Sequence, residues 1–192
     1  TGAGWAERQI GLRDGQLAAG LAPALPVAAL AHRLADTAEG DVVELCPALP
    51  TVAGAIAARI ARRGGAALVV DYGGWRSLGD TFQALRGHQP SDPLAEPGMA
   101  DLTAHVDFEA LALAFRQGGA EATAMVPQGV FLRRLGIDAR AEKLGRGVAG
   151  AALETHSAAH RRLTDPSEMG ELFKVIACHP AGSPPPPGLD PA

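Results

Sequence analysis

Aromatic side chains are scarce in this sequence and make up only 4% of its 192 residues. Hydrophobic residues nevertheless reach 47%, and much of that share is alanine, which buries little apolar area per residue. The sequence therefore predicts a core of Leu, Val and Ile on a few strands, padded by alanine-rich helices. A chain of this length provides one domain, or a large piece of a bigger one.

Positive charge is also in short supply, since 17 Lys and Arg face 21 Asp and Glu and leave a net charge of −4. Proteins that follow nucleic-acid phosphates carry a basic face, so we expect no nucleic-acid partner. No apolar run approaches the about 20 residues that a helix needs to cross a bilayer, so we expect no membrane segment. The chain begins at Thr1 without a signal-peptide pattern, which favours a truncated or processed chain.

Cysteine is limited to Cys46 and Cys178, which lie far apart and form no CxxC pair. This usage favours a reducing, cytoplasmic environment and two inert, buried thiols. His156 and His160 are four residues apart, but no Glu follows His156 as in an HExxH zinc motif, so we expect no metal. The sequence also lacks a Gly-x-Ser-x-Gly elbow and a phosphate-binding glycine loop.

The first 45 residues are predicted to form a hairpin, a short helix and a strand. Asp14-Gly15 stands between two loosely alternating runs, and Asp-Gly is the strongest short-range hairpin signal. We therefore expect a β-hairpin over Trp5 to Leu21. A short helix follows over Val27 to Ala35, and a short strand over Asp41 to Leu45.

The segment from Thr51 to Asp71 is typical of half an α/β winding unit. Thr51 is expected to cap a helix over Val52 to Arg63, which Gly64-Gly65 would end. Ala66 to Val70 is apolar without alternation, as in a parallel strand buried on both faces. Ligands in open α/β sheets bind beyond the carboxyl ends of the strands, so the sequence predicts a site at Asp71 and the residues after it.

The rest of the chain is predicted to alternate loops, helices and strands. Residues 75–100 are rich in Gly, Pro and Asp, and we expect a functional loop there. Asp107 is expected to cap a helix over Phe108 to Gln117, which Gly118-Gly119 would end. The remaining expectations are a strand over Ala122 to Val126, helices over Gln128 to Leu135 and Ala149 to Arg162, a strand over Leu172 to Ala177, and a disordered Pro-rich tail over residues 181–192.

One stretch gathers groups that could carry chemistry. Asp101, Thr103, His105 and Asp107 bring two acids, a hydroxyl and an imidazole within seven positions. A carboxylate and an imidazole of near-neutral pKa can transfer protons. The alternative is structural: Asp107 as a helix cap, Thr103 in a turn and His105 as a partly buried hydrogen-bonding residue. The residues alone indicate an α/β domain with a polar loop at a strand end.

Several blocks occur in a set order along the chain. They are Leu68 to Gly73, Gly79 to Ala84, His88, Asp92 to Leu94, Pro97-Gly98, Ala100 to Phe108, Gln128 to Leu132, Leu135 to Ile137, and Met169 to Val175. Together they resemble the MidA-type S-adenosylmethionine-dependent methyltransferases, bacterial relatives of the mitochondrial complex I assembly-factor arginine methyltransferase. The resemblance runs from Trp5 to Lys174, and Asp101 to Phe108 is its most specific block.

The resemblance implies an α/β fold, the C-terminal part of a Rossmann-like class I methyltransferase sheet, over residues 1–180. In that family a glycine-rich loop after the first strand holds the cofactor, so the resemblance places that loop before residue 1. The Trp5 to Leu21 hairpin would be an insertion and Ala66 to Asp71 the fifth strand. Ala122 to Val126 and Leu172 to Ala177 would be the last two strands, with the final one antiparallel.

The resemblance also implies an activity: methyl transfer from S-adenosyl-L-methionine to a protein arginine, in support of respiratory complex I assembly. It implies that this fragment is inactive without its N-terminal half. It further implies a cytoplasmic place in bacteria and a mitochondrial one for eukaryotic relatives. A half-sheet exposes an unpaired strand edge, so we expect the chain alone to be poorly soluble or a homodimer.

Site residues follow from the guanidinium acceptor, whose planar fork matches carboxylates bidentately. On the resemblance, Asp71, Asp101 and Asp107 line the substrate side, with His105 as a helper or proton acceptor. Tyr72 would pack over the substrate. The other substrate-binding candidates are Gly73, Asp80, Thr81, His88, Thr103 and Gln128.

Two alternatives remain open at this point, a non-catalytic protein-interaction module and a pseudoenzyme fragment. The intact Asp101 to Asp107 block speaks against the pseudoenzyme, and the sequence upstream of Thr1 discriminates between the enzyme and the module. A strand followed by a Gly-x-Gly-x-Gly-like loop there would favour the enzyme, whereas a stop codon and a new start would favour the module.

Overall fold

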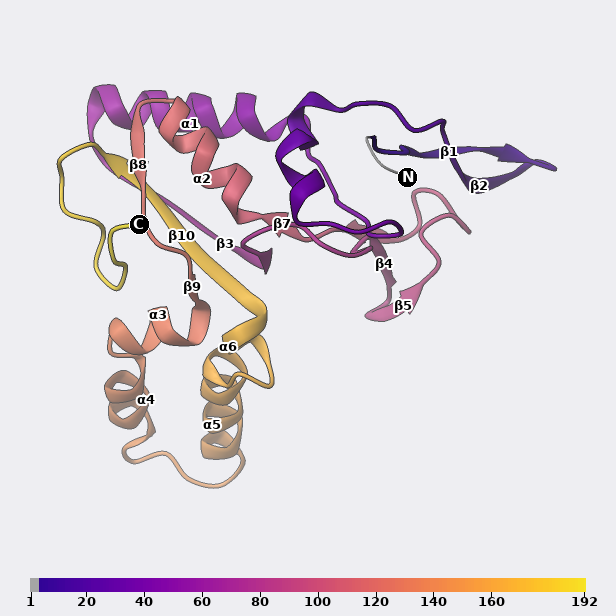
Figure 1. Cartoon of the computed structure of the whole chain (residues 1–192). Helices are drawn as coiled ribbons and strands as arrows, with labels where there is room; N and C mark the ends of the chain where they lie inside the picture. The colour runs from indigo at the N-terminus through magenta and orange to yellow at the C-terminus, as the bar shows by residue number, and fades with distance from the viewer. Residues whose placement is uncertain (1–3) are drawn as a thin grey trace. The chain divides into compact units, whose positions relative to one another are not determined.

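The structure, a computed structural model, describes residues 4–192, and the chain divides into two compact units. The first unit contains the residues up to Glu44 together with Leu78–Ala104. The second contains Leu45–Ser77 and His105–Ala192. Figure 1 labels most of their helices and strands.

The first unit begins with the predicted hairpin. Strand β1 (Arg8–Arg13) pairs antiparallel with β2 (Gln16–Leu21), and the register pairs Arg13 with Gln16. The turn residues Asp14 and Gly15 have φ values of 53° and 78°, as a two-residue turn with two left-handed positions requires. This pairing confirms the prediction from Asp14-Gly15.

A helix follows where Val27 to Ala35 predicted one, but it is a 3-10 helix, η1 (Ala28–Ala35). The strand predicted over Asp41 to Leu45 is wrong, because these residues form no ladder with any strand among residues 4–192. Val42 instead accepts one hydrogen bond, from the Gly79 amide at 2.8 Å. Local β-propensity is not sufficient where no neighbouring strand continues the pairing.

The loop predicted over residues 75–100 is also corrected, because it contains two short strands of a three-stranded sheet. Strand β4 (Gln83–Arg86) pairs antiparallel with β5 (Gln89–Ser91) and with β6 (Asp101–Thr103), in the order β5-β4-β6. Ala84 faces inward and is buried. The pairing of β4 with β6 joins segments 15 or more residues apart, and a short sequence window does not detect it.

The second unit opens with α1 (Leu49–Arg63), which starts earlier than predicted. Thr51 therefore lies inside the helix and is not its cap, since Ala48 holds that position and Pro50 lies in the first turn. The helix ends as predicted, with Arg62 and Arg63 in its last turn and Gly64 at φ 74°.

The main sheet of this unit has the strand order β7-β3-β10-β8, with β9 also paired to β10 (Figure 1). Its central pair is β3 with β10, antiparallel, whereas β3 runs parallel to β7 only at Gly73 and Gly74. The predicted antiparallel final strand is confirmed. The strands are β3 (Ala67–Gly74), β7 (Val106–Asp107), β8 (Ala120–Ala122), β9 (Val126–Pro127) and β10 (Phe173–Pro180).

The single strand predicted over Ala122 to Val126 is thus corrected to two short ones, β8 and β9. Thr123 interrupts the pairing between them. Its hydroxyl accepts a hydrogen bond from the Ala177 amide at 3.0 Å, and its own amide donates to the Ala177 carbonyl at 2.9 Å. The side chain therefore takes part in holding this chain against β10.

Helices α1 and α2 (Phe108–Gln117) cover one face of the sheet. Phe108 and Phe115 are fully buried there beside Ile176 of β10. The prediction that β3 is buried on both faces is wrong, since Leu68 and Val70 are 50% and 42% exposed. The helices pack on the opposite face of β3, with Ala67 and Val69 against their core.

The other helices of this unit gather at the amino end of β10. They are α3 (Gln128–Arg134), α4 (Ile137–Gly145), α5 (Ala151–Thr164) and the single turn α6 (Met169–Leu172). Helices α3 and α5 were predicted, whereas α4 was not. Helices α4 and α5 lie side by side, and α4 contributes no buried residue (Figure 1).

The C-terminal segment was expected to be disordered because its proline run would not pack. Instead Leu189 is buried and lies in a cluster with Phe131 and Val175. Asp190 accepts the Ala124 amide at 2.9 Å through its carbonyl and forms an ion pair with Arg134 at 2.7 Å. Leu189, the Ala124 hydrogen bond and the Arg134 ion pair together attach the segment. In residues 4–192, no helix is long and apolar enough to cross a membrane.

Candidate functional site

The carboxyl end of β3 carries two of the predicted site residues, Tyr72 and Gly73. Strand β7 runs parallel beside this end, and His105 directly precedes it. The Tyr72 ring packs edge-on against His105, with centroids 5.5 Å apart, and against Phe173 at 5.4 Å. The structure therefore brings Tyr72 and His105 together, and the aromatic contacts hold the imidazole at the strand end.

Gly73 has a steric role that sequence reasoning missed. A Cβ at this position would lie 2.1 Å from the Val106 carbonyl oxygen, far inside van der Waals contact. Only glycine allows β7 to approach β3 this closely.

Asp71, the acid predicted at the strand end, is half-buried in β3. Its Oδ1 atom accepts a hydrogen bond from the Tyr72 amide at 2.8 Å. In the register with β10, Asp71 stands opposite Lys174, and opposite charges at paired positions stabilise a sheet.

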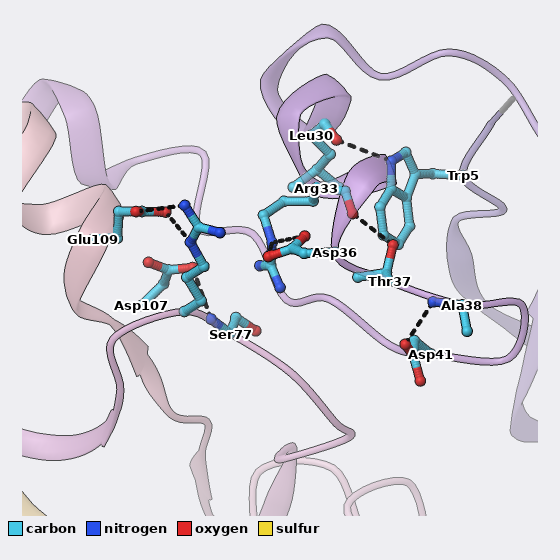
Figure 2. A network of polar contacts seen from close by, with 11 residues as sticks. Trp5, Leu30, Arg33, Asp36, Thr37, Ala38, Asp41, Ser77, Asp107 and Glu109 are labelled. Atoms are coloured by element: carbon cyan, nitrogen blue, oxygen red, sulfur yellow. Dashed lines mark hydrogen bonds and ion pairs between the residues drawn. The ribbon is translucent and has the colours of Figure 1, made fainter.

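Asp107 is built into the scaffold. Its Oδ1 accepts a hydrogen bond from the Ala110 amide at 2.9 Å and so caps α2, as predicted. Its Oδ2 accepts a hydrogen bond from the Ser77 amide at 2.9 Å. Figure 2 shows the Asp107–Ser77 contact beside Glu109, which binds Arg76 bidentately at 2.8 and 2.9 Å. Both carboxylate oxygens of Asp107 thus hold backbone amides, as the structural alternative expected.

Five further candidates lie in the first unit. Asp101 and Thr103 belong to β6, and the Thr103 hydroxyl is buried without a hydrogen-bond partner among the described residues. Asp80 forms an ion pair with Arg8 at 2.7 Å.

Thr81 donates its amide to Glu44 at 2.9 Å, and its hydroxyl also bonds Glu44. His88 is exposed in the β4–β5 turn, with φ 65°. These contacts fix Asp80 and Thr81 against different parts of the first unit, so the structure does not bring these two side chains to one point.

The first unit also contains a polar network that sequence reasoning missed (Figure 2). Arg33 is buried, and its Nε donates to the Asp36 carboxylate at 3.0 and 3.2 Å. The Thr37 hydroxyl donates to the Arg33 carbonyl at 2.6 Å, and the Trp5 indole to the Leu30 carbonyl at 3.2 Å. The bonds of Arg33 and Thr37 stabilise the end of η1, and the Trp5 bond holds its first half. In the sequence, only the Arg33–Asp36 spacing indicates any of them.

Gln128, another predicted substrate contact, is buried at the start of α3. Its side-chain amide donates to the Leu163 carbonyl at 2.9 Å. The residue thereby ties α3 to the last turn of α5.

A pocket of about 430 Å³ adjoins the end of β3. Sequence reasoning identified two of its residues, Gly73 and His105. It missed the charged residues Glu168, Glu171 and Lys174, although the last two lie in the Met169 to Val175 block. The lining consists of Gly73, His105, Pro166, Ser167, Glu168, Glu171, Leu172 and Lys174.

A second pocket, of about 450 Å³, lies between α4 and α5. His156 bonds the Ala141 carbonyl at 2.8 Å and His160 bonds Asp138 at 2.8 Å, so both imidazoles join the two helices. Within residues 4–192, no group of three or more His, Cys, Asp or Glu side chains is arranged to hold a metal ion.

The cysteines differ from the prediction of two buried thiols. Cys178 is buried, and desolvation raises the pKa of its thiol, so it is the inert residue expected. Cys46 is exposed, because it lies in the turn before α1 and not in a strand.

Comparison with known families identifies the class of protein. A family model described as "putative S-adenosyl-L-methionine-dependent methyltransferase" matches residues 1–126 of the 192. The chain belongs to this methyltransferase family, which confirms the resemblance seen in the sequence. The cofactor of the family is S-adenosyl-L-methionine.

Curated relatives are protein arginine methyltransferases of mitochondria. The chain is 42% identical over 128 residues to the NDUFAF7 homolog of Drosophila melanogaster, covering 66% of this chain and 29% of the relative. It is 36% identical over 148 residues to the NDUFAF7 protein of Xenopus laevis, covering 76% and 33%. The chain thus spans about a third of the length of these relatives.

Two solved structures from Burkholderia thailandensis share the fold. An uncharacterized protein matches with TM-score 0.78 and 32% identity, over 98% of this chain and 50% of that one. A second, with S-adenosyl-homocysteine bound, matches with TM-score 0.78 and 30% identity, over 100% and 49%. These matches confirm the α/β class and the Rossmann-like methyltransferase sheet.

The described residues do not by themselves fit the cofactor. In nucleotide-binding α/β folds, glycines at a strand end let a ligand approach the backbone. At Gly73 the space is filled by the Val106 backbone. Nor does either pocket offer an extended apolar wall for an adenine ring, since only Leu153 in one, and Pro166 and Leu172 in the other, are large apolar lining residues.

Proposed function

We propose that the complete protein to which this chain belongs transfers a methyl group from S-adenosyl-L-methionine to an arginine side chain of another protein. The observation that carries this proposal is the 42% identity over 128 residues to a protein arginine methyltransferase. Such similarity within a methyltransferase family supports the same acceptor chemistry.

Within this proposal the chain supplies part of the acceptor side. His105, held by Tyr72 at the end of β3, is our candidate for receiving or orienting the acceptor's proton. Asp71, Asp101 and Thr103 remain candidates for contacts with the acceptor. We assign Asp107 a positioning role, because both of its oxygens hold backbone amides.

The proposal is tested with the complete reading frame, radiolabelled S-adenosyl-L-methionine and arginine-containing proteins from the same cells. Amino-acid analysis of the labelled product is expected to release methylarginine. His105→Gln is expected to lower kcat, with Glu154→Gln, an exposed change on α5, as the control. Label on lysine or on a small molecule, or full activity of His105→Gln, would contradict these assignments.

We further propose that the acceptor belongs to respiratory complex I and that the bacterial protein works in the cytoplasm. The resemblance to the complex I assembly-factor methyltransferase supports the first point, and the mitochondrial names of the relatives are compatible with it. Deletion of the gene is expected to lower NADH–quinone reductase activity in membranes. Unchanged activity in the deletion strain would remove complex I from the proposal.

A further inference from the structure

The pocket beside the end of β3 gathers charged side chains that no step above uses. Glu171 belongs to α6, Glu168 directly precedes that helix, and Lys174 belongs to β10. We propose that this pocket binds the guanidinium of the acceptor arginine, with Glu171 as its principal carboxylate ligand. This inference rests on the proposed transfer to protein arginine.

The Glu171 carboxylate is available for such a ligand. Its side chain is 58% exposed, and the Lys174 ammonium lies 3.8 Å from Oε1. That ammonium bonds the Glu171 carbonyl oxygen instead. A carboxylate accepts several hydrogen bonds, so two N–H groups of a guanidinium can bind Glu171 in the bidentate geometry that arginine favours.

Glu168 is more constrained than Glu171. Its Oε1 accepts the Arg161 Nε at 3.1 Å, and its side chain is 35% exposed. The Arg161 guanidinium therefore neutralises much of the Glu168 charge, and Glu171 is the more exposed carboxylate of the pocket. Glu168 and Glu171 are thus balanced by Arg161 and Lys174, and the attraction for a cationic side chain comes from the exposed Glu171 carboxylate.

Close backbone packing fixes α6, the turn that carries Glu171. A Cβ at Gly170 would lie 2.3 Å from the Thr164 carbonyl oxygen, and one at Gly129 would lie 2.4 Å from the same atom. The two glycines thus let α3, α6 and the end of α5 meet without side chains between them. The backbone that carries Glu171 is therefore fixed before the ligand arrives, which lowers the cost of binding.

The pocket also lies at the strand end where the methyl transfer is proposed. Gly73 and His105 line it together with Glu171, so its mouth adjoins the carboxyl end of β3. Ligands of open α/β sheets bind at that edge. A guanidinium held by Glu171 therefore occupies the pocket that His105 also lines.

The test measures binding and turnover separately in the complete protein. The probe is a fluorescein-labelled Gly-Arg-Gly peptide, and the same peptide with citrulline, which lacks the charge, isolates the guanidinium. Glu171→Gln is expected to weaken binding of the arginine peptide about tenfold, the loss of a charge-assisted hydrogen-bond pair, and to leave the citrulline peptide unaffected. Glu154→Gln is the control, since Glu154 is exposed on α5 outside the pocket.

Turnover separates this inference from the proposed function. If Glu171 binds the acceptor, the Glu171→Gln enzyme shows a KM raised about tenfold with little change in kcat. Arginine methylation with an unchanged KM in Glu171→Gln would overturn the pocket assignment and leave the function standing. Glu171-dependent binding of the arginine peptide without any arginine methylation would leave the pocket standing and overturn the function. If the wild-type protein and Glu171→Gln bind the arginine peptide over the citrulline peptide with equal preference, the pocket assignment is overturned.

Discussion

At the scale of the residue, the contacts of Asp107 distinguish a structural role from a catalytic one. Asp107 caps α2 through Ala110 and holds the Ser77 amide with its second oxygen. A group that already accepts two backbone amides has less capacity for a substrate, and its loss leaves two donors without an acceptor. We therefore expect changes at Asp107 to act first on stability.

Asp107→Ala is expected to lower the free energy of unfolding by about 1–2 kcal/mol, the usual cost of a lost N-cap. Asp107→Asn is the matched variant, because its remaining oxygen can still cap α2 while the amide group no longer accepts from Ser77. Urea unfolding followed by circular dichroism measures both. A loss as large for Asn as for Ala would show that the charge or the Ser77 hydrogen bond, and not the cap, is what matters.

At the scale of the element, backbone contact at glycines sets how the pieces meet. Strand β7 reaches β3 only because Gly73 has no Cβ, and α6 reaches α5 through Gly170. In the sequence, Gly73 lies at the strand end and Gly170 in the Met169 to Val175 block, but each is required by a contact with distant backbone. The site at the end of β3 depends on that contact, since it places His105 beside Tyr72.

Gly73→Ala is expected to destabilise the second unit by about 1–3 kcal/mol or more, because the new methyl group meets the Val106 backbone. Gly54→Ala is the opposite control: it lies inside α1 with nothing within 4 Å of the added Cβ. In a helix that change gains about 0.5–1 kcal/mol. Thermal unfolding of the two variants should move the midpoint in opposite directions, and equal shifts would contradict the contact.

At the scale of the whole molecule, β3 presents a partly unpaired edge. In the part of the chain that the structure describes, β10 pairs along one side of β3, while β7 pairs on the other only at Gly73 and Gly74. Leu68 and Val70 are half exposed on the same strand. An open apolar edge of this kind recruits other chains.

The 192-residue chain alone is therefore expected to self-associate, and Leu68→Lys with Val70→Lys to reduce that association. Light scattering after size-exclusion chromatography measures the mass of each. Leu144→Lys is the control, since Leu144 is equally exposed but lies on α4. A monomeric wild-type chain, or equal rescue by Leu144→Lys, would contradict the role of the edge.

The sequence by itself determined the features that depend on neighbours in the chain. Asp14-Gly15 specified the hairpin, Asp107 the start of α2, and Gly64 the end of α1, because turns and caps involve only a few adjacent residues. The ordered blocks from Leu68 to Val175 also identified the methyltransferase family, which the comparisons confirm. Helix α4 was not predicted, and none of its residues is buried.

Only the tertiary structure decided what distant segments do together. It paired β4 with β6, docked Leu189 beside Phe131, and left Leu68 and Val70 exposed on a strand whose apolar run predicted burial. It also placed Glu171 in one pocket with Gly73 and His105, from positions up to 98 residues apart. These contacts depend on which strands and glycines come together in the folded chain. No local sequence pattern encodes them, because neither residue of such a pair has an unusual sequence context.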